Sequence, residues 1–453
     1  MKLPAPVTQT ELAKRRRQLM RMLGDNAVAV LPAAHEKIRN RDSHYAFRQD
    51  SDFLYLTGFN EPDAIAVLVP GRAAAEYILF CRERDPQAET WNGRRAGTQG
   101  AIDFYGADDA FPIEDMDDIL PGLLEGRERV FYSMGQDAEL DQHMVQWVNH
   151  LRQQSQTIPK SRLHDNGQQQ GPQEFVSLAH LLHDMRLYKT PAEQKQMRTA
   201  AAISVAAHQR AMQVCRPDMY EYAIEAELLY EFHRHGGEPA YSSIVGGGAN
   251  SCILHYVENN QALQDGELLL VDAGCEFRGY ASDITRTYPV NGVFTPAQRA
   301  VYDVVLQAQL AAIDTLRPGN HWADMHDTAV KVLTTGLVKL GLLKGSVARL
   351  IKDESYRQFY MHKTGHWLGL DVHDVGDYRV GNESRVLEPG MVMTVEPGLY
   401  IPAQKGVPKK FWNIGVRIED DVLVTRDKPE VLTQALIKDP AAIEAFMAQA
   451  RAA

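Results

Sequence analysis

Two aspartates in the middle of the chain have the surroundings of a buried carboxylate site. Asp272 follows an uninterrupted apolar run, residues 268–271, which predicts a buried strand. A buried, unpaired charge is costly, so a carboxylate at this point needs a cation or a strong set of donors. Gly274 and Gly279 predict a turn that folds the chain back and brings Asp283 beside Asp272. Either aspartate alone could instead cap a turn.

Three histidines lie close together further along the chain. His362, His366 and His373 fall within twelve residues, among glycine and apolar neighbours. A single histidine of this kind is more often a core residue, whereas three together favour metal binding and proton transfer. The chain has no His-Glu-x-x-His pair, which excludes the zincin arrangement.

Two glutamates end apolar segments nearer the carboxyl terminus. Glu396 follows the run 391–395 and precedes a Pro-Gly turn. In residues 415–419 the period of a strand places Arg417 and Glu419 on the same face. We therefore expect Arg417 beside Glu419, and an exposed Arg–Glu pair of little energetic value is the alternative.

These residues together favour one metal site over separate structural roles. Four carboxylates and one imidazole in one pocket would repel one another unless positive charge is present. Two divalent cations supply four positive charges against the four negative ones. An oxygen-rich set with one histidine suits Mn²⁺ or Co²⁺ better than Zn²⁺, although Zn²⁺ would still bind tightly in vitro. The expected cofactor is two Mn²⁺ per subunit.

The elements that must position these residues include a repeated unit. Thr190 and Thr295 each open a helix with proline at the first position and Glu or Gln at the third, which is a capping box. A second helix is expected after each one, over about 220–235 and 323–340, and short strands follow. A duplicated unit predicts a pseudo-symmetric α+β domain with a site between the copies, and chance similarity is the alternative.

The first part of the chain predicts a separate, mixed α/β domain. Strand-like runs at 27–31 and 64–69 are separated by helix-compatible segments. A chain of 453 residues also exceeds one typical hydrophobic core. The polar, glutamine-rich stretch 165–172 lacks apolar periodicity. We therefore expect an amino-terminal domain over 1–173 and a second domain over 174–453.

Composition and charge exclude several classes of function. The net charge of −11 argues against a nucleic acid partner. The basic run Lys14 to Arg17 alternates with apolar residues, which predicts the solvated face of an amphipathic helix. Neither a secretory signal nor a membrane-spanning run is visible. Four scattered cysteines are typical of free thiols in a reducing compartment, so we expect the cytoplasm.

Five motifs in a fixed order resemble those of the pita-bread metallopeptidases, and of the aminopeptidase P (Xaa-Pro aminopeptidase) group among them. They are residues 271–274, 282–287, 366–374, 394–398 and 417–420. Segments 40–42 and 47–59 are similar to the amino-terminal domain of the same group, so the resemblance covers essentially the whole chain. It implies an α+β, pita-bread catalytic domain with a pseudo-two-fold duplication. The preceding α/β domain would cap the site and form a homo-oligomer, either a dimer or a tetramer.

The resemblance also implies roles for individual residues. The ligands of a dinuclear centre would be Asp272, Asp283, His366, Glu396 and Glu419. Asp283 and Glu419 would bridge both cations, Asp272 would complete one site, and the remaining two ligands the other. Further active-site roles are implied for His255, His362, His373 and Arg417. Trp91 resembles a substrate-binding residue that caps a neighbouring subunit's site, and local packing is the alternative.

The implied reaction is removal of the amino-terminal residue from peptides with proline in second position. The nitrogen of an Xaa–Pro bond carries no hydrogen, and attack by a hydroxide that bridges two cations does not need that donor. Glu396 would carry the proton from the nucleophile to the leaving nitrogen. His255 and His373 would hold the carbonyl oxygen and the substrate backbone. Arg417 would orient carboxylate ligands, and the substrate's amine would lie against Asp272.

Several related functions remain as alternatives. A prolidase cleaves Xaa-Pro dipeptides with the same five ligands and is the nearest. Methionine aminopeptidases share the ligands but lack the long amino-terminal domain, so length argues against them. Creatinase-like enzymes share the fold without metals, and some non-catalytic relatives have lost ligands that this chain retains.

Overall fold

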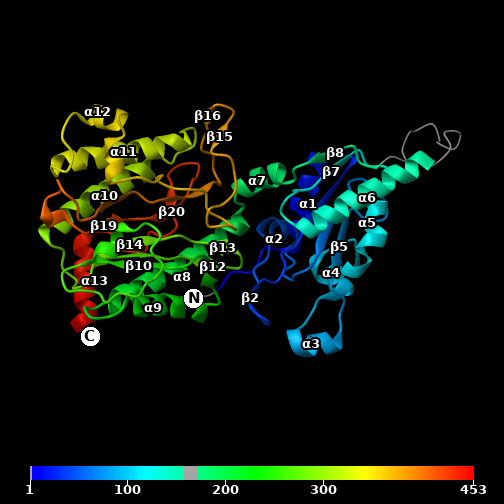
Figure 1. The fold of residues 1–453 in the computed structure, drawn as a ribbon, viewed down its shortest axis with the longest axis horizontal. Helices are drawn as coiled ribbons and strands as arrows, with labels where there is room; N and C mark the ends of the chain where they lie inside the picture. The colour runs from blue at the N-terminus through cyan, green and yellow to red at the C-terminus, as the bar shows by residue number, and fades with distance from the viewer. Residues whose placement is uncertain (1–2, 158–170, 453) are drawn as a thin grey trace. The chain divides into compact units, whose positions relative to one another are not determined.

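The computed structural model describes residues 3–157 and 171–452 (Figure 1). The chain forms two compact units. The amino-terminal unit is Val7–Met185, and the carboxy-terminal unit is Met1–Pro6 together with Arg186–Ala453. Most of the polar stretch 165–172 lies outside the described residues, and the division expected between residues 173 and 174 stays a prediction. None of the described helices is long and apolar enough to cross a membrane.

The amino-terminal unit is built on one mixed sheet. Its strand order is β6 (Asp109–Pro112), β5 (Tyr77–Cys81), β4 (Ile65–Leu68), β1 (Ala27–Pro32), β7 (Arg129–Phe131) and β8 (Glu174–Val176). Central β1 is antiparallel to β4 and parallel to β7. The strands expected at 27–31 and 64–69 are therefore confirmed as β1 and β4. A short hairpin, β2 (Ile38–Asn40) and β3 (Ser43–His44), lies apart from this sheet.

Alternate strand residues form the core of this unit. One face of the sheet packs against α5 (Met116–Leu124) and α6 (Ala138–Thr157), where Val28, Phe80 and Trp147 are buried. Alternation along a strand sends successive side chains to opposite faces, so every second apolar residue reaches this core. The other helices of the first part of the chain are α1 (Gln9–Leu23), α2 (Ser51–Thr57), α3 (Pro86–Asn92), α4 (Gly97–Tyr105), the 3₁₀ turn η1 (Ile113–Asp115) and α7 (Ala179–Leu187).

The basic run on α1 is not wholly a solvated face, so that prediction is wrong for two of its residues. Arg15 and Arg16 are only 3% and 4% exposed. Arg15 donates to the Tyr55 carbonyl at 3.0 Å, and Arg16 donates to the Leu56 carbonyl at 2.8 Å. These carbonyls belong to the last turn of α2, where helical carbonyls lack intrahelical partners and attract cations. Arg15 also lies over the ring of Tyr55, which helps to stabilise a buried guanidinium.

Two helix pairs form the framework of the carboxy-terminal unit. The first pair is α8 (Pro191–Val214) with α9 (Glu221–Arg234), and the second is α10 (Pro296–Asp314) with α11 (Trp322–Lys339). Thr190 and Thr295 cap α8 and α10 through complete capping boxes with proline in the first turn. The repeat predicted from these signals is confirmed, helices included.

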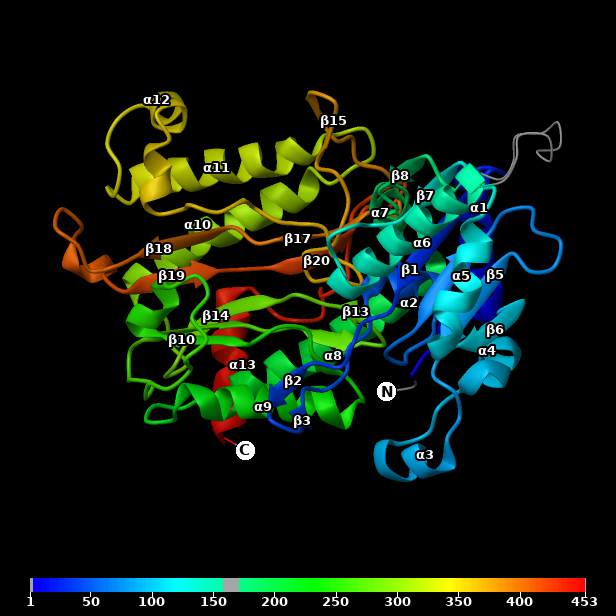
Figure 2. The same cartoon turned by 45° about the vertical axis from the view of Figure 1, so that its right-hand side comes forward.

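Strands fill the space between the two helix pairs (Figures 1 and 2). The first copy contributes the antiparallel sheet β10 (Ile244–Gly247), β11 (Leu268–Asp272) and β14 (Thr285–Pro289). The second copy contributes β17 (Val392–Val395), β20 (Asp420–Leu423) and β21 (Glu430–Val431), with the separate pair β18 (Gly398–Ile401) and β19 (Ile414–Arg417). Apolar side chains of both copies share one core. The unit is therefore the expected α+β pita-bread fold.

Short elements complete this unit. They are β9 (Glu238–Pro239), η3 (Gly248–Cys252), β12 (Cys275–Phe277), β13 (Tyr280–Ala281), α12 (Val347–Lys352), η4 (Ser355–Gln358), β15 (Arg379–Val380), β16 (Glu383–Ser384), η5 (Lys409–Phe411) and α13 (Pro440–Ala452). The long segment between η4 and β17 contains little regular structure. It nevertheless carries all three clustered histidines, which must therefore be held by other contacts.

Candidate metal centre and active site

Asp272 and Asp283 meet at the end of the first sheet. Asp272 is the last residue of β11 and pairs with Thr285 of β14, so Asp283 lies just before that partner strand. The intervening turn requires Gly274, because a Cβ there would lie 1.7 Å from the Ser282 carbonyl oxygen. The hydroxyl of Tyr241 lies within hydrogen-bond distance of both carboxylates, at 2.6 Å from Asp272 Oδ1, so its one hydrogen is shared between them. The predicted approach of the two aspartates is therefore confirmed.

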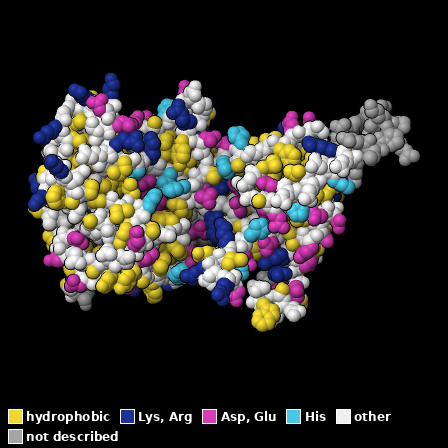
Figure 3. Space-filling view, viewed as in Figure 1, with side chains coloured by type: hydrophobic (Ala, Val, Ile, Leu, Met, Phe, Trp, Pro, Cys, Tyr) yellow, Lys and Arg dark blue, Asp and Glu magenta, His cyan; other side chains and the backbone are white. Residues whose placement is uncertain are grey.

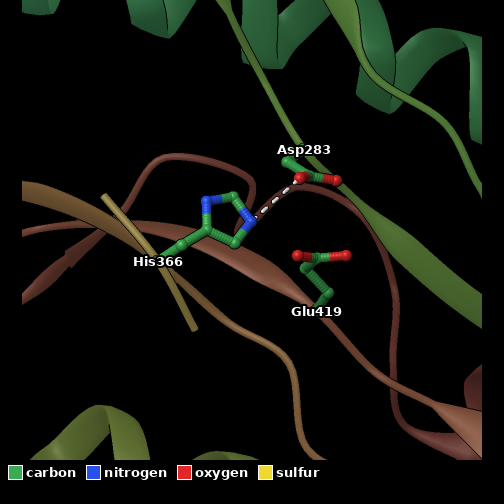
Figure 4. A group of neighbouring side chains, drawn as sticks. All are labelled: Asp283, His366 and Glu419. Atoms are coloured by element: carbon green, nitrogen blue, oxygen red, sulfur yellow. Dashed lines mark ion pairs between the residues drawn. The ribbon is translucent and has the colours of Figure 1, made fainter. Parts of the chain in front are cut away.

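His366 and Glu396 reach the same place from the second copy. His366 Nε2 lies 3.3 Å from Asp283 Oδ2 (Figure 4). The same nitrogen lies 3.7 Å from Glu396 Oε1. The other ring nitrogen, Nδ1, is 2.9 Å from the Trp367 carbonyl oxygen and donates to it. That bond leaves Nε2 as the nitrogen that faces the carboxylates, which is the arrangement of a histidine that ligates a metal.

Glu419 and Arg417 are both buried, at 2% and 3% exposed, so an exposed ion pair is excluded. Strand β19 ends at Arg417, which pairs with Asp272 Oδ2 at 2.6 Å. Thr285 lies between the two residues: its Oγ1 accepts from Arg417 Nε at 3.1 Å and donates to Glu419 Oε2 at 2.6 Å. Arg417 and Glu419 are thus connected through Thr285, while the guanidinium pairs directly with Asp272.

Three of the predicted ligands form a compact group. Asp283, His366 and Glu419 each offer one ligand atom, and these atoms all lie within 4.8 Å of one another (Figure 4). Within residues 3–157 and 171–452, no second group of this kind occurs. Glu396 and Asp272 border the group through His366 and Tyr241 respectively. All five predicted ligands thus lie around one centre.

The protonation behaviour of this group shows an excess of negative charge. Burial and the neighbouring carboxylates raise the pKa of Glu419 well above its usual value. Burial likewise raises the pKa of Glu396 to about 7 and raises that of Asp272, although Arg417 opposes both shifts. Burial alone would lower the pKa of His366, but Asp283 and Glu396 outweigh it and raise it to about 9. Added positive charge would therefore stabilise the ionised form of these carboxylates. Their oxygen-rich donor set fits divalent cations.

The remaining predicted residues of this unit line one cavity of about 1200 Å³ together with the five acidic and imidazole groups. They are His255, His362, His373 and Arg417. The ring of His373 lies 4.3 Å from that of His366, centre to centre. Burial lowers the pKa of His362 to about 3, so this ring is neutral. Figure 3 shows histidine side chains grouped on the visible face of this unit.

Comparisons with known proteins agree with this geometry. Residues 195–426 match the family model "Metallopeptidase family M24", and residues 12–132 match "Aminopeptidase P, N-terminal domain". The Xaa-Pro aminopeptidase of Escherichia coli (strain K12) is 44% identical over 447 residues, which are 98% of this chain and 99% of that protein. The chain belongs to metallopeptidase family M24.

Solved structures of this M24 group match over the same span. Aminopeptidase PepP of Pseudomonas aeruginosa superimposes with a TM-score of 0.95 at 56% identity, covering 99% of this chain and 100% of that one. Zinc-substituted aminopeptidase P of E. coli in complex with product superimposes with a TM-score of 0.94 at 44% identity, with the same coverage. The similarity therefore includes both units and not the catalytic fold alone.

The structure of this M24 member adds residues that the sequence did not single out. Tyr241 holds two predicted ligands, and burial beside Asp272 and Asp283 raises its pKa well above 10, so it remains a donor. The hydroxyl of Tyr400 lies 2.9 Å from His362 Nε2 and accepts from Arg417 Nη1 at 3.0 Å. Tyr241 lies in a loop without periodicity, where no sequence signal indicates it. Tyr400, in contrast, follows the Pro-Gly turn after Glu396, and its closeness in sequence to a predicted ligand is a signal that could have indicated it.

Trp91 belongs to the other unit. It lies on α3, a helix with no buried side chains, and is 82% exposed. The structure contains one copy of the chain, so the predicted reach of Trp91 into a neighbouring subunit stays a prediction.

Proposed function

We propose that this M24 metallopeptidase is a Xaa-Pro aminopeptidase that acts through two Mn²⁺. The observation that carries the proposal is the convergence of four carboxylates and one imidazole on a single buried centre. Asp272, Asp283, His366, Glu396 and Glu419 would hold the cations. When bound, such a pair polarises the scissile carbonyl and supplies a nucleophilic water at neutral pH.

The chain's own residues would orient the substrate and move its proton. Glu396 reaches into the cavity directly after β17, and its carboxylate would accept the proton of the attacking water and pass it to the leaving nitrogen. His255 and His373 line the same cavity, where their ring N–H groups would donate to the carbonyl oxygen as negative charge develops. The substrate's amine would lie against Asp272, which explains removal of one residue at a time.

Arg417 would act on a carboxylate rather than on the substrate. Its guanidinium donates to Asp272, Thr285 and the Tyr400 hydroxyl. Asp272 therefore has one oxygen fixed by Arg417 and the other by Tyr241. A ligand fixed at both oxygens keeps its position when substrate enters, which preorganises the centre.

The cavity favours an aminopeptidase over a prolidase. Its volume of about 1200 Å³ exceeds the range of roughly 300–1,000 Å³ that holds a drug-sized ligand. A dipeptide would leave most of that space empty, whereas a longer peptide could extend beyond the proline. The volume therefore favours peptides longer than a dipeptide as the substrates, and the name of the similar Xaa-Pro aminopeptidases supports proline in second position.

One assay tests the activity and its rival. The protein is first freed of metal with a chelator and then given Mn²⁺, Zn²⁺ or no metal. Substrates are an Xaa-Pro-Yaa tripeptide, the Xaa-Pro dipeptide and an Xaa-Ala-Yaa control. We expect Mn²⁺-dependent release of Xaa from the tripeptide, slower cleavage of the dipeptide and little from the control. A preference for the dipeptide would assign a prolidase, and an intact tripeptide with every metal would reject the proposal.

The assembly and the compartment are part of the same proposal. An 82%-exposed tryptophan on a helix without buried side chains supports a homo-oligomer in which Trp91 contacts a neighbouring subunit. Four free cysteines are compatible with the cytoplasm. Sedimentation analysis of Trp91→Ala beside the wild type tests the first point: an unchanged assembly with unchanged KM would assign Trp91 to neither role.

A further inference from the structure

The loop that carries His255 has little regular structure of its own. Residues 253–260 form neither helix nor strand. His255 is exposed toward the cavity, whereas Tyr256 and Asn259 in the same loop are only 5% and 1% exposed. An exposed loop without a hydrogen-bonded ladder does not by itself fix a side chain to the precision that catalysis needs. The position of His255 must therefore depend on the two buried residues.

Glu221, the first residue of α9, is the partner of Tyr256. Its side chain is fully buried, and its two carboxylate oxygens receive four hydrogen bonds. The donors are the Gly247 amide at 2.8 Å, Asn250 Nδ2 at 3.0 Å, the Tyr256 hydroxyl at 2.7 Å and the Gln261 amide at 2.9 Å. These donors precede and follow His255 in the chain, so one carboxylate closes the loop at both ends.

Asn259 provides the second attachment. Its backbone has a φ of +46°, which asparagine tolerates better than most residues. Its side-chain oxygen accepts from the Val245 amide at 3.0 Å, and its amide donates to the Ser243 carbonyl at 2.9 Å. The loop is therefore tied to β10 as well as to α9, and His255 lies in its part that lines the cavity, together with Leu254 and Val257.

We propose that Glu221 is a positioning residue for His255: through the Tyr256 hydroxyl it fixes residues 253–257 and thereby aims the imidazole at the substrate carbonyl. The inference rests on the proposed role of His255. A buried carboxylate that accepts hydrogen bonds at both oxygens is held rigidly. Any movement that breaks one of these bonds leaves a buried polar group unpaired, which costs free energy. Rigidity next to a reacting group matters since a misplacement of about 1 Å can cost a hundredfold in rate.

The test uses the metal-loaded enzyme and an Xaa-Pro-Yaa tripeptide. Tyr256→Phe removes one hydroxyl and keeps the buried ring, and Glu221→Gln replaces two acceptor oxygens by one. We expect kcat/KM to fall about tenfold in the first and about a hundredfold in the second, with bound metal unchanged. Tyr222→Phe and Glu227→Gln, which alter exposed or half-buried side chains on α9, serve as matched controls and should retain wild-type rates.

A second readout separates positioning from general destabilisation. Amide hydrogen exchange in residues 253–257 should be faster in Tyr256→Phe than in the wild type, in both metal-free and metal-loaded protein, while exchange in β11 should equal that of the wild type in the same metal state. If exchange in both segments rises equally, the hydroxyl has a global structural role and the inference is wrong. Should Glu221→Gln not fold, Tyr256→Phe alone decides.

A double variant then connects the effect to His255. If Glu221 acts through His255, the pair His255→Ala/Tyr256→Phe should be no slower than His255→Ala alone. Losses that multiply would overturn the inference while leaving the role of His255 intact. The inference would also be overturned, with the role of His255 intact, if Tyr256→Phe and Glu221→Gln kept wild-type rates while His255→Ala was slow. An unimpaired His255→Ala would instead reject the proposed role of His255 itself.

Discussion

The two units of the chain differ in what their interiors contain. In the amino-terminal unit, the main core is apolar, and buried guanidinium groups such as Arg16 donate to carbonyl oxygens and lie over aromatic rings. In the carboxy-terminal unit, acidic groups meet at a single buried centre, where they raise one another's pKa values. Burial of apolar side chains, with hydrogen bonds for the buried guanidinium groups, is therefore sufficient to account for the interior of the amino-terminal unit. The interior of the carboxy-terminal unit contains a repulsion among carboxylates that bound cations relieve, or that protonation relieves where cations are absent.

The largest expected effect comes from removing a carboxylate that we propose as a metal ligand. Asp283→Asn should lose metal and almost all activity, more than the roughly 100-fold that loss of an outer partner costs. The fold should survive, because the amide occupies the same space and one negative charge leaves a crowded centre. Activity on an Xaa-Pro-Yaa tripeptide and bound metal by atomic absorption measure both changes. Asp303→Asn, on the exposed side of α10, is the matched control. An unchanged rate would refute the role of Asp283 as a ligand.

The next effect should separate catalysis from metal binding within the same unit. His373→Ala removes a ring that lines the cavity but has no place among the predicted ligands. We expect normal metal content and a kcat lower by about 10²–10³-fold, as for the loss of one oxyanion donor. His233→Ala, which alters an exposed histidine on α9, is the control. Loss of metal together with activity would instead make His373 a ligand.

Chelation should destabilise one unit and spare the other. Metal at 100 times its Kd adds about 2.7 kcal/mol to the stability of the state that binds it. Hydrogen exchange in β11, β14, β17 and β20 should therefore accelerate after chelation, while exchange in β1, β4 and β5 should not change. Equal acceleration in both sets of strands would contradict the comparison between the units.

The same experiment has a predicted pH dependence. In the metal-free protein, the folded-state pKa of Glu396 is about 7, above the 4.5 of an ordinary glutamate, and that of His366 is about 9, above 6.5. Both groups hold a proton in the folded state that the unfolded chain releases at lower pH. Their contribution to stability is thus present at low pH and lost as pH rises through these values. The effect of chelation on the carboxy-terminal unit should be larger at pH 8 than at pH 5.

Sequence predicted the centre because its chemistry is local. Asp272 and Glu396 each follow or end an apolar strand, and a charge at the end of such a run is visible without coordinates. The helix pairs were equally predictable, since Thr190 and Thr295 carry complete capping boxes. In each of these cases the physical cause lies within a few residues of its effect.

Contacts between distant segments were not predictable in this way. Arg417 pairs with Asp272, 145 positions away, rather than with Glu419. Arg15 and Arg16 are buried because the end of α2, 40 positions along the chain, offers carbonyl groups to them. Tyr241 gave no signal, because a tyrosine in an irregular loop acquires its role only when the sheet brings two aspartates to it. A local sequence pattern cannot show which distant segments lie side by side in the fold. The hydrogen-bond partners of these side chains depend on that arrangement.

The smallest expected effect belongs to the amino-terminal unit and tests the comparison from its other side. His35 has Asp63 Oδ1 at 2.7 Å from Nδ1 and Asp137 Oδ2 at 3.0 Å from Nε2, so both ring nitrogens face carboxylates. The hydrogen bond with Asp63, followed by that with Asp137, raises the pKa of His35 to about 9, against burial. Ordinary histidine titrates near 6.5, so the folded state binds the proton more tightly than the unfolded state does.

The stabilisation by His35 is therefore fully present below pH 6.5 and is lost as pH rises through 9. The side chain is 58% exposed, and exposed ion pairs contribute only about 0–1 kcal/mol. His35→Gln should accordingly speed hydrogen exchange in β1 and β4 slightly at pH 6 and not at pH 9.5, with exposed His44→Gln as the control. A loss that persists at pH 9.5 would mean that His35 acts by packing. The charge of His35 would then contribute nothing to the stability of the amino-terminal unit. The two units would differ even more in how far their stability depends on charge.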